Sequence, residues 1–172
     1  MTEKKKLIFW RRIAAFIIDI GIILVLGFLI AIFINLITMG APVTPFEVYL
    51  RTIICFSIPL WLYFILNDFS KSGSTIGKKI LKIHVVTSEG ERLRLYQAIS
   101  RTAIKFIPWE MVSLSFFGFS EDWGIFSITQ VISITITIIL IFLYIIIMIK
   151  MKGVKGIYDL ISHTQITRRN DS

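Results

Sequence analysis

The sequence predicts an all-α integral membrane protein with four transmembrane helices and a small cytoplasmic β-hairpin insert, and three observations predict this fold. First, hydrophobic residues make up 55% of the 172 residues and charged residues only 17%, against about 25% charged residues in an average soluble domain. Second, two apolar runs are each long enough to cross a ~30 Å hydrocarbon layer as a helix. Third, the basic residues cluster in segments that a single orientation places on one side of the membrane.

The two apolar runs are residues 13–37 and 125–149, which form the first and last predicted spans. The first run contains one charged residue, Asp19, and the last run contains none. Residues 132–137 of the last run alternate in polarity like a half-buried strand. A lone strand cannot cross lipid with its backbone groups unpaired, so we expect both runs to be helices.

Two further spans are predicted at residues 48–66 and 104–120, and the second of these depends on the distribution of charge, since it contains Lys105 and Glu110. If residues 104–120 cross the membrane, both termini are cytoplasmic and 18 of the 19 basic residues lie inside, with only Arg51 outside. If the segment lies along the inner surface instead, the tail and its five basic residues lie outside. The four-span arrangement fits the positive-inside rule better, and it explains the net charge of +8 without nucleic-acid binding.

On the cytoplasmic side, the sequence predicts an insert at residues 67–103 and a tail at residues 150–172. The insert contains an alternating segment, Ile80–Val86, then a turn cluster with a glycine, and then a second short alternation, Arg92–Leu95. Such a pattern is typical of a β-hairpin. Because an isolated hairpin is only marginally stable in water, we expect residues 164–167 of the tail to add a third strand.

Other short motifs in the chain do not predict chemistry. Residues 73–79 resemble a phosphate-binding loop, but three residues separate the glycines where four are needed, and Lys79 stands where a hydroxyl is needed. We expect a turn that leads into a strand there. His84 and His163 have no partner ligands at metal-binding spacing, so we expect no metal and no cofactor. The sequence shows no nucleophile–base pair, so we do not expect an enzyme.

Four segments resemble, in the same order, the RDD family of bacterial membrane proteins, which is named for one arginine and two aspartates. The matching segments are residues 11–19 (RRIAAFIID), residues 74–86 (STIGKKILKIHVV), Ser100-Arg101 with residues 107–110 (IPWE), and residues 156–164 (GIYDLISHT). Together they extend over almost the whole chain, so we treat residues 1–172 as a single RDD-type membrane domain.

The resemblance assigns the name-giving residues to positions of this sequence. The arginine is Arg11 or Arg12, with Arg12 favoured, and the two aspartates are Asp19 and Asp159. His163 stands where a glycine is common in relatives, so the local turn is expected to differ there. The resemblance implies a multi-pass membrane protein for which transport is the usual suggestion, and it implies no mechanism.

Five charged residues are the candidates for an ion pathway or for structural ion pairs: Arg12, Asp19, Arg101, Glu110 and Asp159. Asp19 lies about 9 Å into the first span, where an ionised carboxylate needs a partner or water. We expect Arg12 and Arg101 to act as counter-charges for Asp19 and Glu110. In the functional interpretation the two carboxylates titrate, and in the structural interpretation an ion pair between Asp19 and an arginine locks helices together.

A polar stripe in the last span has the same two interpretations. Gln130, Ser133 and Thr137 are spaced so that they share one face of a helix. They either line a pathway or pack against a neighbouring helix.

Two functions from different classes are compatible with these features. One is a small cation- or proton-coupled transporter that uses membrane-embedded carboxylates and works as a homo-oligomer, because four spans form only a thin wall. The other is a non-catalytic membrane adaptor or scaffold whose cytoplasmic hairpin binds a partner protein or anionic lipid, with Asp19 in a structural ion pair. In both cases we expect a multi-pass protein of the cell membrane, embedded in the lipid bilayer, with both termini cytoplasmic and no nucleic-acid partner.

Overall fold

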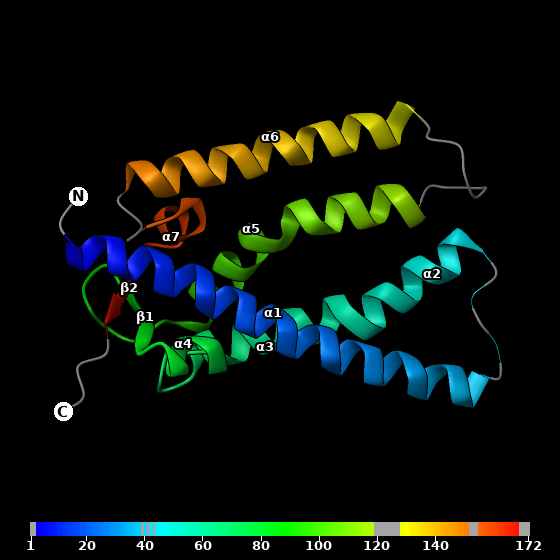
Figure 1. The fold of residues 1–172 in the computed structure, drawn as a ribbon, viewed down its shortest axis with the longest axis horizontal. Helices are drawn as coiled ribbons and strands as arrows, with labels where there is room; N and C mark the ends of the chain where they lie inside the picture. Colours follow the sequence, from blue (N-terminus) through cyan, green and yellow to red (C-terminus); the bar gives the residue numbers. More distant parts are fainter. Residues whose placement is uncertain are drawn as a thin grey trace.

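The computed structural model describes residues 3–38, 40, 42, 44–118, 128–151 and 155–168. Long helices run side by side along most of the length of the molecule, and short helices and a two-stranded sheet gather at one end (Figure 1). We call this the sheet end, and it holds α4 (Ile76–Ile80), β1 (Ile83–Thr87), α7 (Ile157–Ile161) and β2 (Thr164–Arg168).

The long helices form four consecutive passes along the body of the molecule. They are α1 (Glu3–Thr38), α2 (Pro45–Thr52) with the π-helix η1 (Ile53–Ser57) and α3 (Ile58–Phe69), α5 (Leu95–Ser113) with the π-helix η2 (Leu114–Gly118), and α6 (Ile128–Lys150). α1 runs away from the sheet end, α2 to α3 return to it, α5 runs away again and α6 returns (Figure 1).

Three helices have the length and apolar composition of membrane spans among the described residues: Leu7–Thr38, Pro45–Phe69 and Gln130–Lys150. They cover the first, second and last predicted spans, apart from residues 125–129 of the last span, of which residues 125–127 lie outside the described part of the chain. The predicted span at residues 104–120 falls on α5 and η2, which are not among the three, and its last two residues are not described. Length and composition therefore support a mostly helical protein with three spans.

Each proline inside a long helix coincides with a specific adjustment of the backbone. Pro59 has no N–H to donate to the carbonyl of Cys55, and the π-helix η1 ends at Ser57, two residues before it. Pro108 was expected near the start of a helix, but α5 begins at Leu95, so this proline lies well inside it. The carbonyl of Ile104 therefore lacks its usual donor, and it accepts a hydrogen bond of 2.5 Å from the hydroxyl of Tyr144 on α6.

The sheet confirms one predicted pairing and corrects another. β1 pairs in antiparallel register with β2, from Ile83 opposite Arg168 to Thr87 opposite Thr164, so the expected tail strand exists and is the direct partner of β1. The predicted hairpin strand Arg92–Leu95 is wrong. The backbone N–H of Arg94 donates to the side chain of Gln97 at 2.9 Å, which caps the first turn of α5 and ends any extended segment there.

The core below the sheet joins the sheet end to the long helices. Its fully buried members come from α1, β1, the loop before α5, α5 itself and β2: Ala15, Ile83, Val85, Leu93, Ala98 and Ile166. A second cluster lies further along the helices: Ile23, Leu60, Phe64 and Phe106. The apolar face that the alternation of β1 predicts therefore packs on α1 and α5.

The segment at residues 73–79 also differs from the prediction of a turn leading into a strand, because most of it forms the short helix α4. Thr75 caps this helix with its side chain, which accepts from the N–H of Lys78 at 3.4 Å. In the turn after α7, His163 adopts φ +53°, a left-handed conformation that glycine adopts more easily.

Candidate functional site

Five buried side chains of alternating charge form a continuous series of ion pairs at the sheet end. In order they are Arg12, Asp159, Arg101, Asp68 and Lys78, and they come from α1, α7, α5, α3 and α4. We call this series the ion-pair chain. Because each member belongs to a different element, the ion-pair chain connects three of the long passes, at α1, α3 and α5, to the short helices α4 and α7.

Each carboxylate in the ion-pair chain lies between two cations. Asp159 pairs with Arg12 through one oxygen and with Arg101 through the other. Asp68 accepts from Arg101 Nε at 3.2 Å and from Lys78 Nζ at 2.5 Å. All five residues are at most 6% exposed. Burying an ion costs several kcal/mol unless it is paired and hydrogen-bonded, so the alternation of sign is what makes this burial tolerable.

The start of α7 fixes the position of Asp159. Its carboxylate accepts from the backbone N–H of Gly156 at 2.7 Å, and the ring of Tyr158 lies 5.1 Å from both the Arg12 and Arg101 guanidinium carbons. Burial acts to raise the pKa of Asp159, but the positive charges of Arg101 and Arg12 outweigh it and hold this pKa below its usual value. Asp159 is therefore ionised at neutral pH.

Two opposing effects act on the pKa of Lys78, which lies at the other end of the ion-pair chain. Burial lowers the pKa of Lys78, while the negative charge of Asp68 acts to raise it. Its ammonium also lies 5.9 Å from the centre of the Phe64 ring. Asp68 is thus the residue that makes a buried lysine possible at this position.

Asp19 accepts hydrogen bonds from three uncharged donors. Its carboxylate accepts from the hydroxyls of Tyr63 at 2.7 Å and Thr75 at 2.5 Å, and from the backbone N–H of Gly77 at 2.8 Å. It is fully buried. A β-carbon at position 77 would lie only 2.3 Å from the carbonyl oxygen of Ala15, so glycine is required for this close approach of α4 to α1. Asp19 thus attaches the insert to the first helix, and the expected arginine counter-charge pairs with Asp159 instead.

Like Asp19, Glu110 accepts hydrogen bonds from uncharged donors, but it lies at a different depth in the helical assembly. It accepts from Ser57 Oγ and Trp61 Nε1, each at 3.2 Å, and it borders a groove of about 450 Å³ beside α3 and η1. Ser57 belongs to the π-helical turn in the middle of the second span. Among the described residues Glu110 forms no ion pair, so the expected counter-charge from Arg101 is absent, because Arg101 binds Asp68 and Asp159.

The polar stripe of α6 faces α5. Ser133 accepts from Ser115 Oγ at 2.6 Å and donates to the carbonyl of Met111 at 3.3 Å, while Thr137 donates to the carbonyl of Pro108 at 3.5 Å. These contacts join two passes of the chain. They match the helix-packing interpretation of the stripe.

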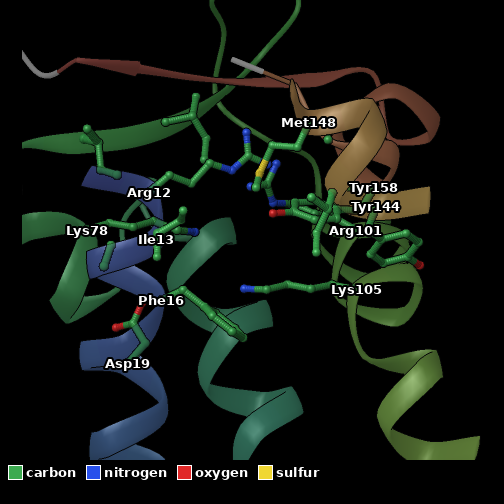
Figure 2. A pocket seen from close by; sticks show the side chains of 15 residues that line it. Arg12, Ile13, Phe16, Asp19, Lys78, Arg101, Lys105, Tyr144, Met148 and Tyr158 are labelled. Atoms are coloured by element: carbon green, nitrogen blue, oxygen red, sulfur yellow. The ribbon is translucent and has the colours of Figure 1, made fainter. Parts of the chain in front are cut away.

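A cavity of about 270 Å³ lies at the sheet end beside the ion-pair chain (Figure 2). Its charged lining residues are Arg12, Asp19, Lys78, Arg101 and Lys105. Apolar residues of α1 and α6, including Ile13, Phe16, Ile145 and Met148, form much of the remaining wall. Within the described residues, no group of three or more histidine, cysteine, aspartate or glutamate side chains is arranged to hold a metal ion.

Comparison with known families identifies the chain, since the family model for RDD matches residues 8–163. The chain belongs to the RDD family. In this RDD protein Arg12 is the arginine that pairs with Asp159, whereas Arg11 donates to the carbonyl of Leu81 at 3.1 Å. No curated protein and no solved structure matches the chain.

The structure of this RDD protein separates the five sequence candidates into two groups. Arg12, Arg101 and Asp159 lie together in the ion-pair chain, while Asp19 and Glu110 each lie apart from it with uncharged donors. Sequence reasoning missed Asp68, Lys78 and Lys105 as site residues. A usable signal existed for Asp68 and Lys78, since each is a charge at the edge of an apolar segment, but only their contact across the fold shows that they form a pair.

Proposed function

We propose that this RDD protein is a small proton-coupled transporter of the cell membrane, in which Glu110 is the carboxylate that gains and loses the proton. The observation that carries the proposal is the position of Glu110 among neutral donors at the middle of the second span. Ser57 lies twelve residues, or about 18 Å, from the end of that span at Phe69. This depth is close to the centre of a ~30 Å hydrocarbon layer.

The partners of Glu110 permit a change of protonation. A neutral Glu110 leaves behind a hydroxyl and an indole N–H, both uncharged, whereas a neutral Asp159 would remove the carboxylate that two buried guanidinium groups, Arg12 and Arg101, share. We propose that the proton reaches or leaves the carboxylate through the groove beside Glu110, whose other lining residues are mostly apolar. The π-helical turn that holds Ser57 is a kind of irregularity that often occurs at functional sites.

The proposal includes four spans with both termini cytoplasmic. It is supported by the course of the chain, since α5 starts at the sheet end and α6 starts at the opposite end (Figure 1). The passes before and after α5 have the length and composition of spans, so we expect α5 with η2 to cover the same distance between them. A topology reporter fused after Ser172 is expected to remain cytoplasmic, and reporter activity on the outer side would refute this orientation.

Proton flux in proteoliposomes tests the function. The wild-type protein is expected to dissipate an imposed pH gradient, and Glu110→Gln is expected to abolish this activity while retaining the fold. Glu47→Gln is the matched control, because it makes the same chemical change at an exposed carboxylate of α2. A gradient that persists with wild-type protein, or flux that is unchanged in Glu110→Gln, would contradict the proposal. Asp19→Asn is a poorer test, because Asp19 accepts three hydrogen bonds and its loss alters the fold.

A non-catalytic adaptor remains the second candidate function, favoured by the fixed roles of Asp19 and Asp159. Both carboxylates connect the sheet end to the long helices, as a scaffold requires. An adaptor would give no flux with any of these variants. It would instead bind a partner protein through β1, β2 and the loops around them.

A further inference from the structure

The cavity at the sheet end has an excess of positive charge. Four cationic side chains from three different helices line it: Arg12, Lys78, Arg101 and Lys105. Among the described lining residues, Asp19 is the single carboxylate. The oxygens of Asp19 are already occupied by Tyr63, Thr75 and Gly77. The two carboxylates of the ion-pair chain, Asp68 and Asp159, are not among the lining residues.

Three of the four cations have counter-ions, and Lys105 does not. Arg12, Arg101 and Lys78 each bind Asp68, Asp159 or both. Lys105 forms no ion pair or hydrogen bond with any residue that the structure describes. Counted with Asp19, the site holds four basic side chains and three carboxylates, so one basic side chain has no carboxylate partner.

Aromatic rings hold the ammonium group of Lys105 in place without neutralising it. Its Nζ lies 3.9 Å from the centre of the Phe64 ring, 4.3 Å from that of Phe16 and 5.1 Å from that of Phe106. Cation–π contacts stabilise an ammonium by less than the cost of burying an ion without a counter-ion. Figure 2 shows the side chain extending from α5 into the space that faces α1.

The rest of the wall is apolar and open. Phe16 and Ile145 line the cavity and remain 37% and 43% exposed, so the cavity opens on the side that these residues of α1 and α6 form. Ile13 and Met148 lie on the same walls. A cationic interior with an apolar mouth suits a molecule that has an anionic group and a hydrocarbon part.

We propose that this cavity binds an anionic phosphate group, with Lys105 as the principal contact, and that an attached hydrocarbon chain lies against the apolar walls of α1 and α6. The volume of about 270 Å³ accommodates a headgroup and not a whole lipid. The phosphate can come from a phospholipid or from free phosphate, and only the phospholipid uses the apolar mouth. This site is distinct from Glu110, and it does not depend on transport.

Ligand binding to the full-length protein in detergent micelles tests the proposal, with phosphatidylglycerol, zwitterionic phosphatidylcholine and inorganic phosphate as probes. We expect phosphatidylglycerol to bind more tightly than phosphatidylcholine, and Lys105→Gln to weaken that binding about tenfold, the effect of losing one charge-assisted hydrogen bond. Lys79→Gln is the matched control, because Lys79 is an exposed lysine on neighbouring α4. It should change binding less than twofold, and Lys105→Arg should preserve it.

Each outcome of this experiment decides the proposal. Preference for phosphatidylglycerol that depends on Lys105 supports a phospholipid occupant, and equally tight, Lys105-dependent binding of inorganic phosphate supports a free anion. Equal binding of both lipids by the wild type, or equal effects of Lys105→Gln and Lys79→Gln, would overturn the site. If Lys105→Gln does not fold, the wild-type comparison of the two lipids still decides. Loss of proton flux in Glu110→Gln with intact lipid binding separates this inference from the proposed function.

Discussion

Asp159 and Glu110 are both carboxylates inside the helical assembly, but their partners are of opposite kinds. At the sheet end, Asp159 binds two arginines, and it shares one of them with Asp68 in the ion-pair chain. In the body of the helices, Glu110 accepts from a serine and a tryptophan. The first arrangement fixes charges in place, because losing either carboxylate removes a counter-ion from two buried cations. The second leaves only neutral groups behind, so a proton can bind there at lower cost.

Other polar side chains in the body of the helices, away from the sheet end, also bind neutral groups. Ser133, Thr137 and Tyr144 of α6 donate to backbone carbonyls of α5 or of their own helix. Contacts of this kind are individually weak, about 0.6 kcal/mol on average between helices in a membrane. Substitutions at the sheet end should therefore affect stability more than equivalent substitutions in the helical body.

The largest effect is expected from Asp159→Asn, which keeps the shape of the side chain and removes its charge. Arg12 and Arg101 then lose their shared counter-ion, so the free energy of unfolding should fall by about 3–5 kcal/mol. Thermal unfolding in detergent micelles measures the loss. Glu110→Gln is the matched control in the helical body and should cost about 1 kcal/mol. Equal losses in the two variants would remove the distinction between the two regions.

Acid should weaken the sheet end in the same direction. The folded-state pKa of Asp159 lies below its unfolded value of about 3.9, so its contribution to stability is complete above about pH 5 and is lost as the pH falls through the folded-state pKa. Melting temperatures measured from pH 7 down to pH 3 should fall in the wild type. The fall should be smaller in Asp159→Asn, and identical curves for the two proteins would contradict this assignment.

A moderate effect is expected from Gly77→Ala. The added β-carbon would lie 2.3 Å from the Ala15 carbonyl oxygen and 2.9 Å from Asp19 Oδ1, so α4 must shift away from α1. Overpacking of this kind costs about 1–3 kcal/mol. Gly21→Ala on α1 is the control, because nothing lies within 4 Å of its added carbon. A Gly77→Ala variant as stable as Gly21→Ala would show that the contact is not tight.

The smallest effect is expected in the helical body, from Tyr144→Phe. This change removes the hydroxyl that satisfies the Ile104 carbonyl, at a cost of about 0.5–1.5 kcal/mol. In a Pro108→Ala background the backbone regains an N–H that can reach the same carbonyl, so Tyr144→Phe should cost less there. A double-mutant cycle in micelles measures the difference. Strict additivity of the two changes would show that Tyr144 does not compensate for the proline.

The long elements were predictable because their signals are local. Twenty or more apolar residues in a row must form a helix in lipid, and this places the first and last spans from composition alone. The alternation of Ile83 and Val85 likewise predicts a strand with a buried face. Arg92–Leu95 shows where this reasoning fails, since four alternating residues also suit the first turn of a helix, and the capping contact of Gln97 decides between them.

The candidate site was predictable as a set of residues and not as a set of pairs. Arg12, Asp19, Arg101, Glu110 and Asp159 are conspicuous because charges are rare in apolar segments. Their partners depend on contacts between residues up to 147 positions apart, as for Arg12 and Asp159. Asp19 was expected to have an arginine counter-charge, but the insert folds back and supplies two donors, Thr75 and Gly77, and Tyr63 of α3 supplies the third.

The sequence by itself determined that this chain enters a membrane and which charges must be compensated, because hydrophobic length and the cost of burying an ion are properties of the residues themselves. Only the tertiary structure decided how each charge is compensated. Compensation requires an opposite charge or a donor within about 3 Å, and such proximity arises only when helices, strands and the insert pack together. The same packing left Lys105 without a counter-ion beside an open cavity, which no pattern in the sequence indicates.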